Sequence, residues 1–416
     1  MTRGRRRLGR RGQVVNRNPV RAEEDLRVGL VAACAFPAPR GSQVLIQEMA
    51  ESLAEEGVDT HLIAPLDPRA RERPYHTHAV EPAVPRARAG GLTGLLRPLV
   101  DATLTARLAS TVAREGLQVL HAHNYEGLVT SLAVRALRGV PVVYHSHNVF
   151  ADELPTYAPR TLRGAAGRFG AWCDRTFPRL ADRVVTLSDD VSAHLGALGV
   201  ESHRISVIPP GLDPTPFDAH RAKLRKRRAI FTGNLDGYQN LELLLSAWRL
   251  VEARDPSSEL VLVTHVQRGG AARRLRRAHL GERVRVRVVT SLDEVAQELG
   301  SSMVAVSPRA SWSGFPIKTL NYMASGTPTL ALAASAKGVR PGETGWVVDG
   351  DTPKALASAL VSALGAPRDC ARRGRAALQV LREHHRWDRL APQIVDVARA
   401  AIADSEQDAS RTRRVA

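Results

Sequence analysis

The chain has 416 residues, 44% hydrophobic and 24% charged, which is the composition of a globular protein with more than one core. Three widely spaced cysteines exclude a disulfide framework. No apolar run reaches the roughly 20 residues of a membrane-spanning helix. The basic N-terminus also lacks the apolar core of a secretion signal, so we expect a cytoplasmic protein, with peripheral contact at the inner membrane face left open.

The net charge of +17 is concentrated in three basic segments, 3–21, 221–228 and 273–287. Such charge suits an anionic surface or a phosphate-bearing substrate, although an arginine-rich composition alone would also produce it. Aromatic residues make up only 4% of the chain and do not interleave with the basic segments, which argues against a nucleic-acid partner. Residues 1–24 have no periodicity, and we expect a disordered basic arm.

From residue 25 to about residue 210, buried strands alternate with amphipathic helices. This pattern predicts a doubly wound α/β domain over 25–210 with a parallel sheet. The segment 67–90 is predicted to be irregular. The apolar segment 91–100 fits a packed helix, a lid or a contact with a membrane surface. The strands are expected at 27–33, 60–64, 119–122, 140–145, 183–187 and 205–208.

A proline-rich stretch and a run of basic residues predict a linker over 211–228. The alternation then restarts and predicts a second Rossmann-like domain over 229–385, followed by a helix over 386–403 and a disordered tail over 404–416. In such folds, ligands bind outside the carboxyl ends of the strands, so we expect a cleft between the two domains. The strands of the second domain are expected at 229–232, 259–264, 284–289 and 303–306, and its helices at 241–253, 271–280, 292–299 and 317–324.

The stretch 306–326 combines a strand end, a polar loop and the start of a helix. Free backbone N–H groups at such a helix start favour an anion, and Arg309 and Lys318 add positive charge. The alternative to an anion site is an ordinary strand–loop–helix crossover with no ligand. Earlier in the chain, Gly41 follows the first strand and would allow a close backbone approach to a phosphate. Asp349 and Asp351 fit a turn and a helix N-cap better than a metal site.

Two histidine pairs close neighbouring predicted strands, His121 with His123 and His145 with His147. The spacing of two places both members of a pair on one face of the strand. A metal site would need three or four such ligands, and the alternative is a polar cluster with His147 contacting substrate. Two carboxylates follow, at 152 and 153. They could hydrogen-bond a hydroxylated acceptor, and the alternative is that they are a helix N-cap and an acid in the first turn of the helix.

Six segments in order resemble the retaining glycosyltransferases of family 4, which have the GT-B fold. The resemblance spans about residues 26–402. Its segments are FPAPRGSQ, the junction at 181–217, GNLDGYQNLELLLSA, VSPRASWSGFPIKTLNYMASGTP, ETGWVVDGDTPKALASAL and EHHRWDRLAPQI, the last resembling the element whose final helix crosses back onto the first domain.

The resemblance implies that the N-terminal domain binds an acceptor and the C-terminal domain a nucleotide-diphosphate sugar, with transfer under retention and without a cofactor or bound metal. It places His147 where the family has a histidine near the transferred sugar, and we expect His147 to be the catalytic residue. Residues implied in acceptor binding are His123, Asn148, Asp152 and Glu153. Residues implied in donor binding are Gly41, Ser42, Gly233, Asn234, Arg309, Ser313, Gly314, Phe315, Pro316, Ile317, Lys318 and Asn321.

This sequence departs from the family at its charged donor residues. Ser313 and Asn321 stand where the family has the two glutamates of Glu-x7-Glu, and Asn234 and Gln239 stand where it has an arginine and a lysine. We therefore expect Arg309 and Lys318 to hold the diphosphate, with Gln239 contributing little. The expected acceptor is a glycan, a lipid-linked sugar or another cell-envelope hydroxyl. The alternatives are a nucleotide-sugar binder without transfer, an epimerase, or a basic surface-binding protein on this scaffold.

Overall fold

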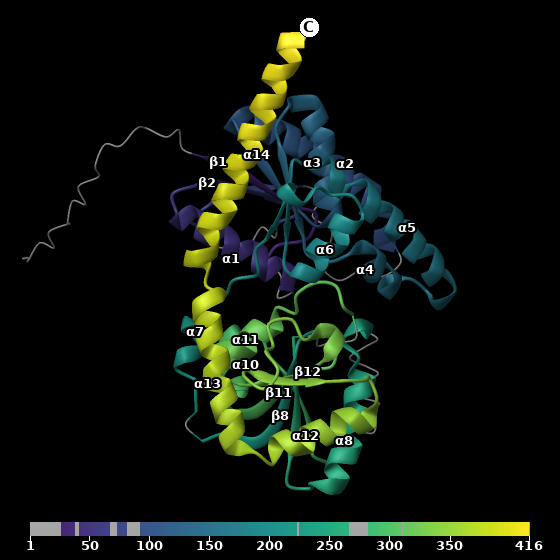
Figure 1. Cartoon of the computed structure of the whole chain (residues 1–416), viewed down its shortest axis with the longest axis vertical. Coiled ribbons are helices and arrows are strands. Elements are labelled where there is room, and N and C mark those ends of the chain that lie inside the picture. Colours follow the sequence, from purple (N-terminus) through teal and green to yellow (C-terminus); the bar gives the residue numbers. More distant parts are fainter. Residues whose placement is uncertain are drawn as a thin grey trace, which may run out of the picture.

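Two parallel sheets, one in each domain, organise the computed structural model of the chain (Figure 1). The structure describes residues 26–37, 41–66, 73–80, 92–222, 224–265, 282–309 and 311–415, with backbone only for 92–101 and 412–415. The predicted basic arm over 1–24 and the predicted helix over 271–280 lie outside these residues.

The N-terminal domain is built on a seven-stranded sheet with the order β3-β2-β1-β4-β5-β6-β7 and parallel pairing throughout. Its strands are β1 (Arg27–Ala32), β2 (Asp59–Ala64), β3 (His76–Ala79), β4 (Val119–His123), β5 (Val142–Ser146), β6 (Arg183–Thr186) and β7 (Ile205–Val207). Its helices are α1 (Gly41–Glu55), α2 (Leu92–Glu115), α3 (Asn124–Arg138), α4 (Phe150–Tyr157), α5 (Arg163–Thr176) and α6 (Asp189–Ala197).

The C-terminal domain has a six-stranded parallel sheet with the order β10-β9-β8-β11-β12-β13. Its strands are β8 (Lys226–Thr232), β9 (Glu259–Thr264), β10 (Val284–Val288), β11 (Ser302–Ser307), β12 (Thr329–Leu332) and β13 (Gly345–Val348). Its helices are α8 (Leu241–Arg254), α10 (Leu292–Ser301), α11 (Lys318–Ala324), α12 (Pro353–Leu364) and α13 (Pro367–His384), and α7 (Thr215–Asp218) precedes β8.

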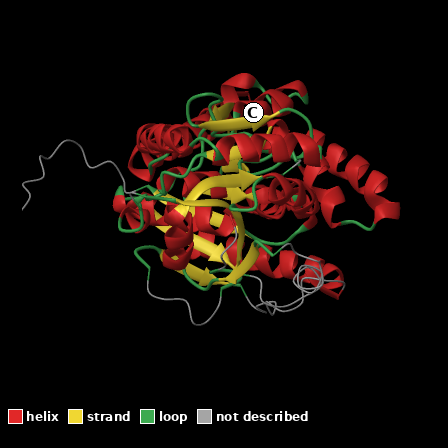
Figure 2. Ribbon diagram, turned by 90° about the horizontal axis from the view of Figure 1, so that it is seen from below, coloured by secondary structure: helices red, strands yellow, loops and turns green. Residues whose placement is uncertain are grey.

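Helices cover both faces of each sheet, as the view along the long axis shows (Figure 2). In the N-terminal domain, α1 and α14 (Trp387–Val415) pack on one face, and α2 and α3 pack on the other. The central strands are therefore buried on both sides, which explains why they read as continuous apolar runs rather than as alternating patterns. The doubly wound α/β prediction is confirmed.

The chain passes between the domains at two places that lie side by side. The backbone N–H of Leu212 donates to the carbonyl of His385 (2.7 Å), and the indole of Trp387 packs on Gly211 so closely that a Cβ there would lie 2.6 Å from the ring. Beyond Trp387, α14 runs back along the N-terminal domain (Figure 1). An ion pair of 2.6 Å joins Arg183 to Asp404.

Three segments predicted to be irregular are ordered in part, and the first, 67–90, contains the edge strand β3. The predicted tail over 404–416 was wrong, because α14 continues as a helix to Val415. The predicted linker over 211–228 contains the short helix α7 and the first residues of β8. Apolar contacts explain the first part of α14: Leu390, Ile394 and Val397 are buried against α1, and the helix propagates from that anchored part.

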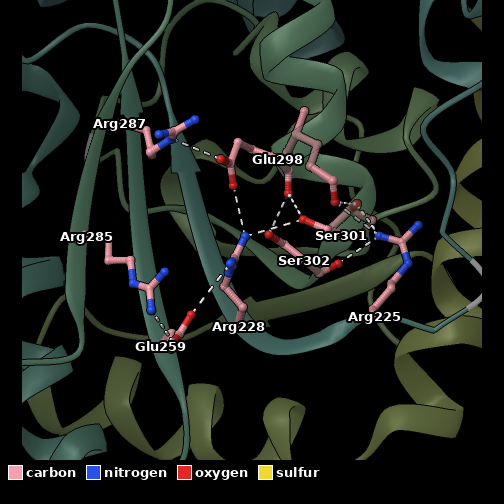
Figure 3. Close-up of polar contacts among 10 residues, drawn as sticks. Arg225, Arg228, Glu259, Arg285, Arg287, Glu298, Ser301 and Ser302 are labelled. Atoms are coloured by element: carbon pink, nitrogen blue, oxygen red, sulfur yellow. Dashed lines mark hydrogen bonds and ion pairs between the residues drawn. The ribbon is translucent and has the colours of Figure 1, made fainter.

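Several arginines in the described parts of the second and third charged segments are paired inside the C-terminal domain (Figure 3). Arg228 is buried and contacts Glu298 at 2.9 Å and Glu259 at 3.6 Å. On β10, at the edge of the sheet, Arg285 pairs with Glu259 (3.0 Å) and Arg287 with Glu298 (3.1 Å). These arginines neutralise half-buried carboxylates, and two of them place charge on an edge strand, so their role in the fold accounts for part of the charge.

Candidate active site

A cavity of about 460 Å³ lies between the two domains, at the carboxyl ends of the strands in both sheets. The N-terminal domain contributes the segments after β1, β4 and β5, and the C-terminal domain contributes those after β8 and β11. The predicted site residues that line it are Gly41, Ser42, His147, Asn148, Glu153, Gly233, Asn234, Arg309, Phe315, Pro316, Ile317 and Lys318.

Lys318 is the central cation of the C-terminal wall. Its ammonium donates to the side-chain oxygen of Gln239 at 2.5 Å and lies 4.1 Å above the ring of Phe231. Burial, and secondarily the positive charge of Arg309, hold the pKa of Lys318 well below its usual value. A bound anion would reverse this shift, because an opposite charge favours the protonated amine.

Gln239 belongs to a polar network that holds the loop after β8. Its amide nitrogen donates to Asn234 (3.0 Å), and Asn234 donates to Asp236 (2.8 Å) and to the hydroxyl of Tyr238 (3.0 Å). Gly233 has a φ of +138°, and a Cβ there would lie 3.6 Å from the Lys318 ammonium. The amine of Lys318 therefore reaches the loop on which the family carries its lysine. Because Gln239 positions this amine, the expectation that Gln239 contributes little does not fit the geometry.

Arg309 is the second basic residue of this wall and is half-buried. It donates to the hydroxyl of Ser311 (3.0 Å) and to the carbonyl of Ser313 (2.6 Å), and its guanidinium lies 5.4 Å from the ring of Tyr238. Burial lowers the pKa of this guanidinium. Arg309 therefore shapes the loop after β11 as well as lining the cavity.

Ser313 and Asp152 form a contact between the domains. The Asp152 carboxylate accepts hydrogen bonds from the Ser313 hydroxyl (2.5 Å), the Ser313 backbone N–H (3.2 Å) and the Ser311 hydroxyl (2.5 Å). Ser313 is fully buried. Neither Ser313, predicted in donor binding, nor Asp152, predicted in acceptor binding, lines the cavity, and the two residues contact each other instead. Asp152 and Glu153 do lie in the first turn of α4.

Gly314 makes the neighbouring close approach. It has a φ of +73°, and a Cβ at this position would lie 1.7 Å from the side-chain oxygen of Asn148. Gly41 makes a similar close approach at the start of α1, because a Cβ at this position would lie 3.2 Å from the side chain of Ile317. Gly314 thus packs against the N-terminal domain rather than opening toward a donor. Asn321, on α11, also lies outside the cavity lining.

His147 ends a cluster of four buried histidines. Its Nε2 lies 3.0 Å from Nδ1 of His123, and Nε2 of His121 lies 2.9 Å from Nδ1 of His145. Burial lowers the pKa of all four rings, that of His147 to about 4, so they are neutral near pH 7. His147 lines the cavity, whereas His123 is fully enclosed. The predicted contact of His123 with the acceptor is therefore corrected: His123 orients His147.

The first three rings of this cluster, His121, His123 and His145, present nitrogens within 4.8 Å of one another. They are fully enclosed, and the group contains no carboxylate that would balance a buried dication. We interpret the cluster as the polar support of His147.

Asp174 holds the loop that carries Asn148, and sequence reasoning missed it. Its carboxylate accepts the backbone N–H groups of Phe150 (3.0 Å) and Ala151 (2.8 Å) at the start of α4, together with the hydroxyl of Tyr125. It lies on α5, 24 and 23 residues along the chain from the two N–H groups that it accepts, so no local cap pattern points to it. The described residues contain no helix with both the length and the apolar character to cross a bilayer.

Comparisons with known proteins place these features in a family. Residues 39–216 match the model of Glycosyltransferase Family 4, and residues 226–366 match the model of Glycosyl transferases group 1. The D-inositol 3-phosphate glycosyltransferase of Rhodococcus opacus is 28% identical over 396 residues, covering 88% of this chain and 86% of the relative.

Solved structures share the architecture. The sucrose-phosphate synthase of Thermosynechococcus elongatus superposes with a TM-score of 0.78 at 20% identity, over 91% of this chain and 100% of that one. Anabaena HepE in complex with UDP-glucose superposes with a TM-score of 0.65 at 15% identity, over 89% of this chain and 98% of that chain. The two domain models together cover most of the sequence, and the chain belongs to the glycosyltransferases that join a family 4 domain to a group 1 domain in a GT-B architecture. It is a glycosyltransferase, as predicted.

Proposed function

We propose that this enzyme transfers a sugar, with retention, from a nucleotide-diphosphate sugar to a hydroxyl of a lipid-linked or other cell-envelope acceptor. The observation that carries the proposal is the division of charge across the cavity. Among its described residues, the C-terminal wall holds the basic side chains of Lys318 and Arg309 and one acid, Asp236, which accepts a hydrogen bond from Asn234. The N-terminal wall holds Glu126 and Glu153. A diphosphate is therefore attracted to the first wall and a polyol acceptor to the second.

Lys318 suits the charge change of the transfer. The bond between the sugar and the diphosphate breaks, the acceptor oxygen bonds to the same carbon, and the acceptor proton passes to the leaving diphosphate. Negative charge grows on the diphosphate during this step, and a preorganised cation beside it stabilises the transition state. The helix α11 begins only at Lys318 and has 7 residues, so the two side-chain cations carry this role rather than the helix dipole.

The neutral ring of His147 and the carboxylate of Glu153 are proposed to orient hydroxyls. Glu153 accepts hydrogen bonds from Asn148 (3.2 Å) and from the hydroxyl of Tyr157 (3.0 Å), and both carboxylate oxygens are thereby fixed at the cavity. A fixed carboxylate and a fixed imidazole provide the positioning that an acceptor hydroxyl needs.

Two observations support an acceptor with a phosphate or lipid part. The Rhodococcus relative is named for D-inositol 3-phosphate, a phosphorylated polyol. In this chain, α5 projects from the side of the N-terminal domain and exposes Phe169 and Trp172, whose rings stack at 5.8 Å (Figure 1). Exposed arginines flank them at 168 and 175. Aromatic and basic residues on one exposed helix are typical of contact with an anionic membrane.

The proposal is tested with the full chain in a thermal-shift screen of UDP- and GDP-sugars. A donor that binds only the folded protein raises Tm. Product formed with that donor and a polyol phosphate or lipid-linked acceptor is then analysed by NMR, where an unchanged anomeric configuration is expected. An inverted product would contradict retention, and no Tm shift with any nucleotide sugar would contradict the donor assignment.

Membrane contact is tested separately by sedimentation with vesicles containing phosphatidylserine. The double variant F169A/W172A should bind several-fold less than the unaltered chain while keeping its response to the donor. If F169A/W172A and the unaltered chain bind the vesicles equally, the proposed membrane contact through α5 is wrong.

The alternative is that the protein binds a nucleotide sugar without transferring it. This alternative is favoured because Ser313 and Asn321 replace both glutamates of the Glu-x7-Glu motif. A donor that raises Tm but yields no glycoside and no free sugar would establish this alternative.

A further inference from the structure

A second cluster of ligating side chains lies at the edge of the N-terminal sheet, remote from the cavity. Asp59 and His61 lie on β2, and His76 and His78 lie on the neighbouring edge strand β3. His61 pairs in register with His76. Asp59 begins β2, so the cluster lies at the opposite end of the strand from the carboxyl ends that border the cavity. The glycosyl transfer proposed above makes no use of these residues.

Three ligand atoms of the cluster converge. Nε2 of His61 lies 3.1 Å from Oδ1 of Asp59, and Nε2 of His76 lies 3.4 Å from the same oxygen. All three atoms lie within 4.8 Å of one another. Ligands bound at 2.0–2.1 Å around a tetrahedral zinc are separated by about 3.3 Å, so both distances fit ligands of one ion, as they also fit direct contacts between Asp59 and each imidazole.

The surroundings of His61 support this interpretation. Its side chain is only 4% exposed, and its Nε2 makes no hydrogen bond despite the nearby carboxylate. The rings of His61 and His76 stack with centroids 4.7 Å apart and an interplanar angle of 24°, so the exposed His76 ring would rotate to direct its Nε2 at an ion shared with His61. The other ring nitrogen of His61, Nδ1, lies 2.9 Å from Nε2 of His78. Such a second contact fixes the tautomer and orientation of a metal-binding imidazole.

We propose that Asp59, His61 and His76 bind a divalent transition metal, with zinc as the expected ion and a water as the fourth ligand. Two imidazoles and one carboxylate form a donor set that zinc accepts, and the side chains of Asp59 and His76 are 35% and 68% exposed, which leaves an open side for the ion and its water. The ion would tie the four-residue edge strand β3 to β2 and so stabilise this border of the sheet.

The test is zinc binding by the untagged full chain after dialysis against a chelator, measured by calorimetry and by metal content after gel filtration. One zinc per chain is expected. His76→Ala and Asp59→Asn should remove it, and His78→Ala should weaken it by about 10–100-fold, the usual effect of losing a second-shell partner. His203→Ala, a surface histidine outside the cluster, is the matched control and should bind as the unaltered chain does.

Thermal unfolding gives a second measurement. Zinc should raise the Tm of the unaltered chain and of His203→Ala but not that of His76→Ala, whose exposed position makes misfolding an inadequate explanation of lost binding. Zinc that remains bound at full stoichiometry in both His76→Ala and Asp59→Asn, or a chain that binds no zinc, would overturn the proposal.

Discussion

The ammonium of Lys318 and the side-chain oxygen of Gln239 are in hydrogen-bond contact at 2.5 Å, although 79 residues separate them along the chain. Gln239 stands where the resemblance places a lysine of the family. It contacts Lys318, which comes from α11. We infer that Lys318 supplies to this loop the basic side chain that the resemblance places at position 239.

This contact predicts coupled effects on donor affinity. Lys318→Ala should weaken binding of the nucleotide sugar by about 2–3 kcal/mol, or roughly 30–150-fold, because a charged hydrogen bond to phosphate is lost. Gln239→Ala should cost about 1 kcal/mol, since Lys318 remains but is no longer positioned. The double variant should bind about as weakly as Lys318→Ala alone. Calorimetry measures all three, with Lys354→Ala, an exposed lysine on α12, as control. Additive losses would contradict the coupling.

Donor binding should be accompanied by proton uptake. Burial keeps the pKa of Lys318 well below its usual value in the free enzyme, and a diphosphate beside the amine should raise it again. Donor affinity should then fall as the pH rises above the lowered pKa. Calorimetric titrations in two buffers of different ionisation enthalpy measure the protons taken up. Lys318→Met should abolish the uptake, and an uptake that persists in this variant would assign it to another group.

The buried pair of Ser313 and Asp152 predicts that the family's glutamate is not tolerated here. Ser313→Glu would place a second carboxylate against Asp152, and the buried like charges should reduce kcat/KM by about 2–4 kcal/mol, or roughly 30–1000-fold. Adding Asp152→Asn removes one charge and supplies a donor, so the double variant should recover at least tenfold. Asp152→Asn alone should be less active than the unaltered enzyme. Full activity of Ser313→Glu would show that this interdomain contact is absent during turnover.

His147 should act as a neutral ring throughout the useful pH range. Burial lowers its pKa to about 4, so kcat/KM should show no step from this group between pH 6 and 8. His147→Ala should lower kcat by about tenfold or more through a lost hydrogen bond to substrate, while His123→Ala, which removes only its orienting partner, should cost less. A step near pH 6.5 that disappears in His147→Ala would contradict neutrality.

Glu48 should make folding stability depend on pH. Its carboxylate accepts from the indole of Trp387 (2.8 Å) between α1 and α14, and burial raises its pKa from 4.5 to about 7. Between these values the native state binds more protons than the unfolded state, so this group's contribution to stability is lost as the pH rises from 4.5 to 7. Glu48→Gln keeps the contact without the charge, and at pH 8 it should be more stable by about 1–3 kcal/mol.

The buried histidines act in the opposite direction, because their lowered pKa values make stability rise with pH up to about 6.5. The difference between Glu48→Gln and the unaltered chain, measured by urea unfolding at several pH values, therefore isolates Glu48. A difference that does not change with pH would contradict the raised pKa.

The architecture was predictable because it is encoded locally. Apolar runs such as β1 and β11, with glycine and proline at the ends of elements, are sufficient to predict alternating strands and helices. Gly41, His147 and Lys318 could be placed at the cavity because parallel strands bring their carboxyl ends to one edge. The helical end of α14 was missed, since the tail is polar and its helix extends from a packed segment farther back.

The partners within the site were decided only in three dimensions. Ser313 and Asp152 are 161 residues apart, and Lys318 and Gln239 come from different elements. A hydrogen bond depends on distances within a few tenths of an ångström, which residue types and spacings along the chain do not specify. Sequence alone therefore determined which strand ends and loops border the cleft, and the packing of one domain against the other determined which of their side chains line the cavity and which contact each other.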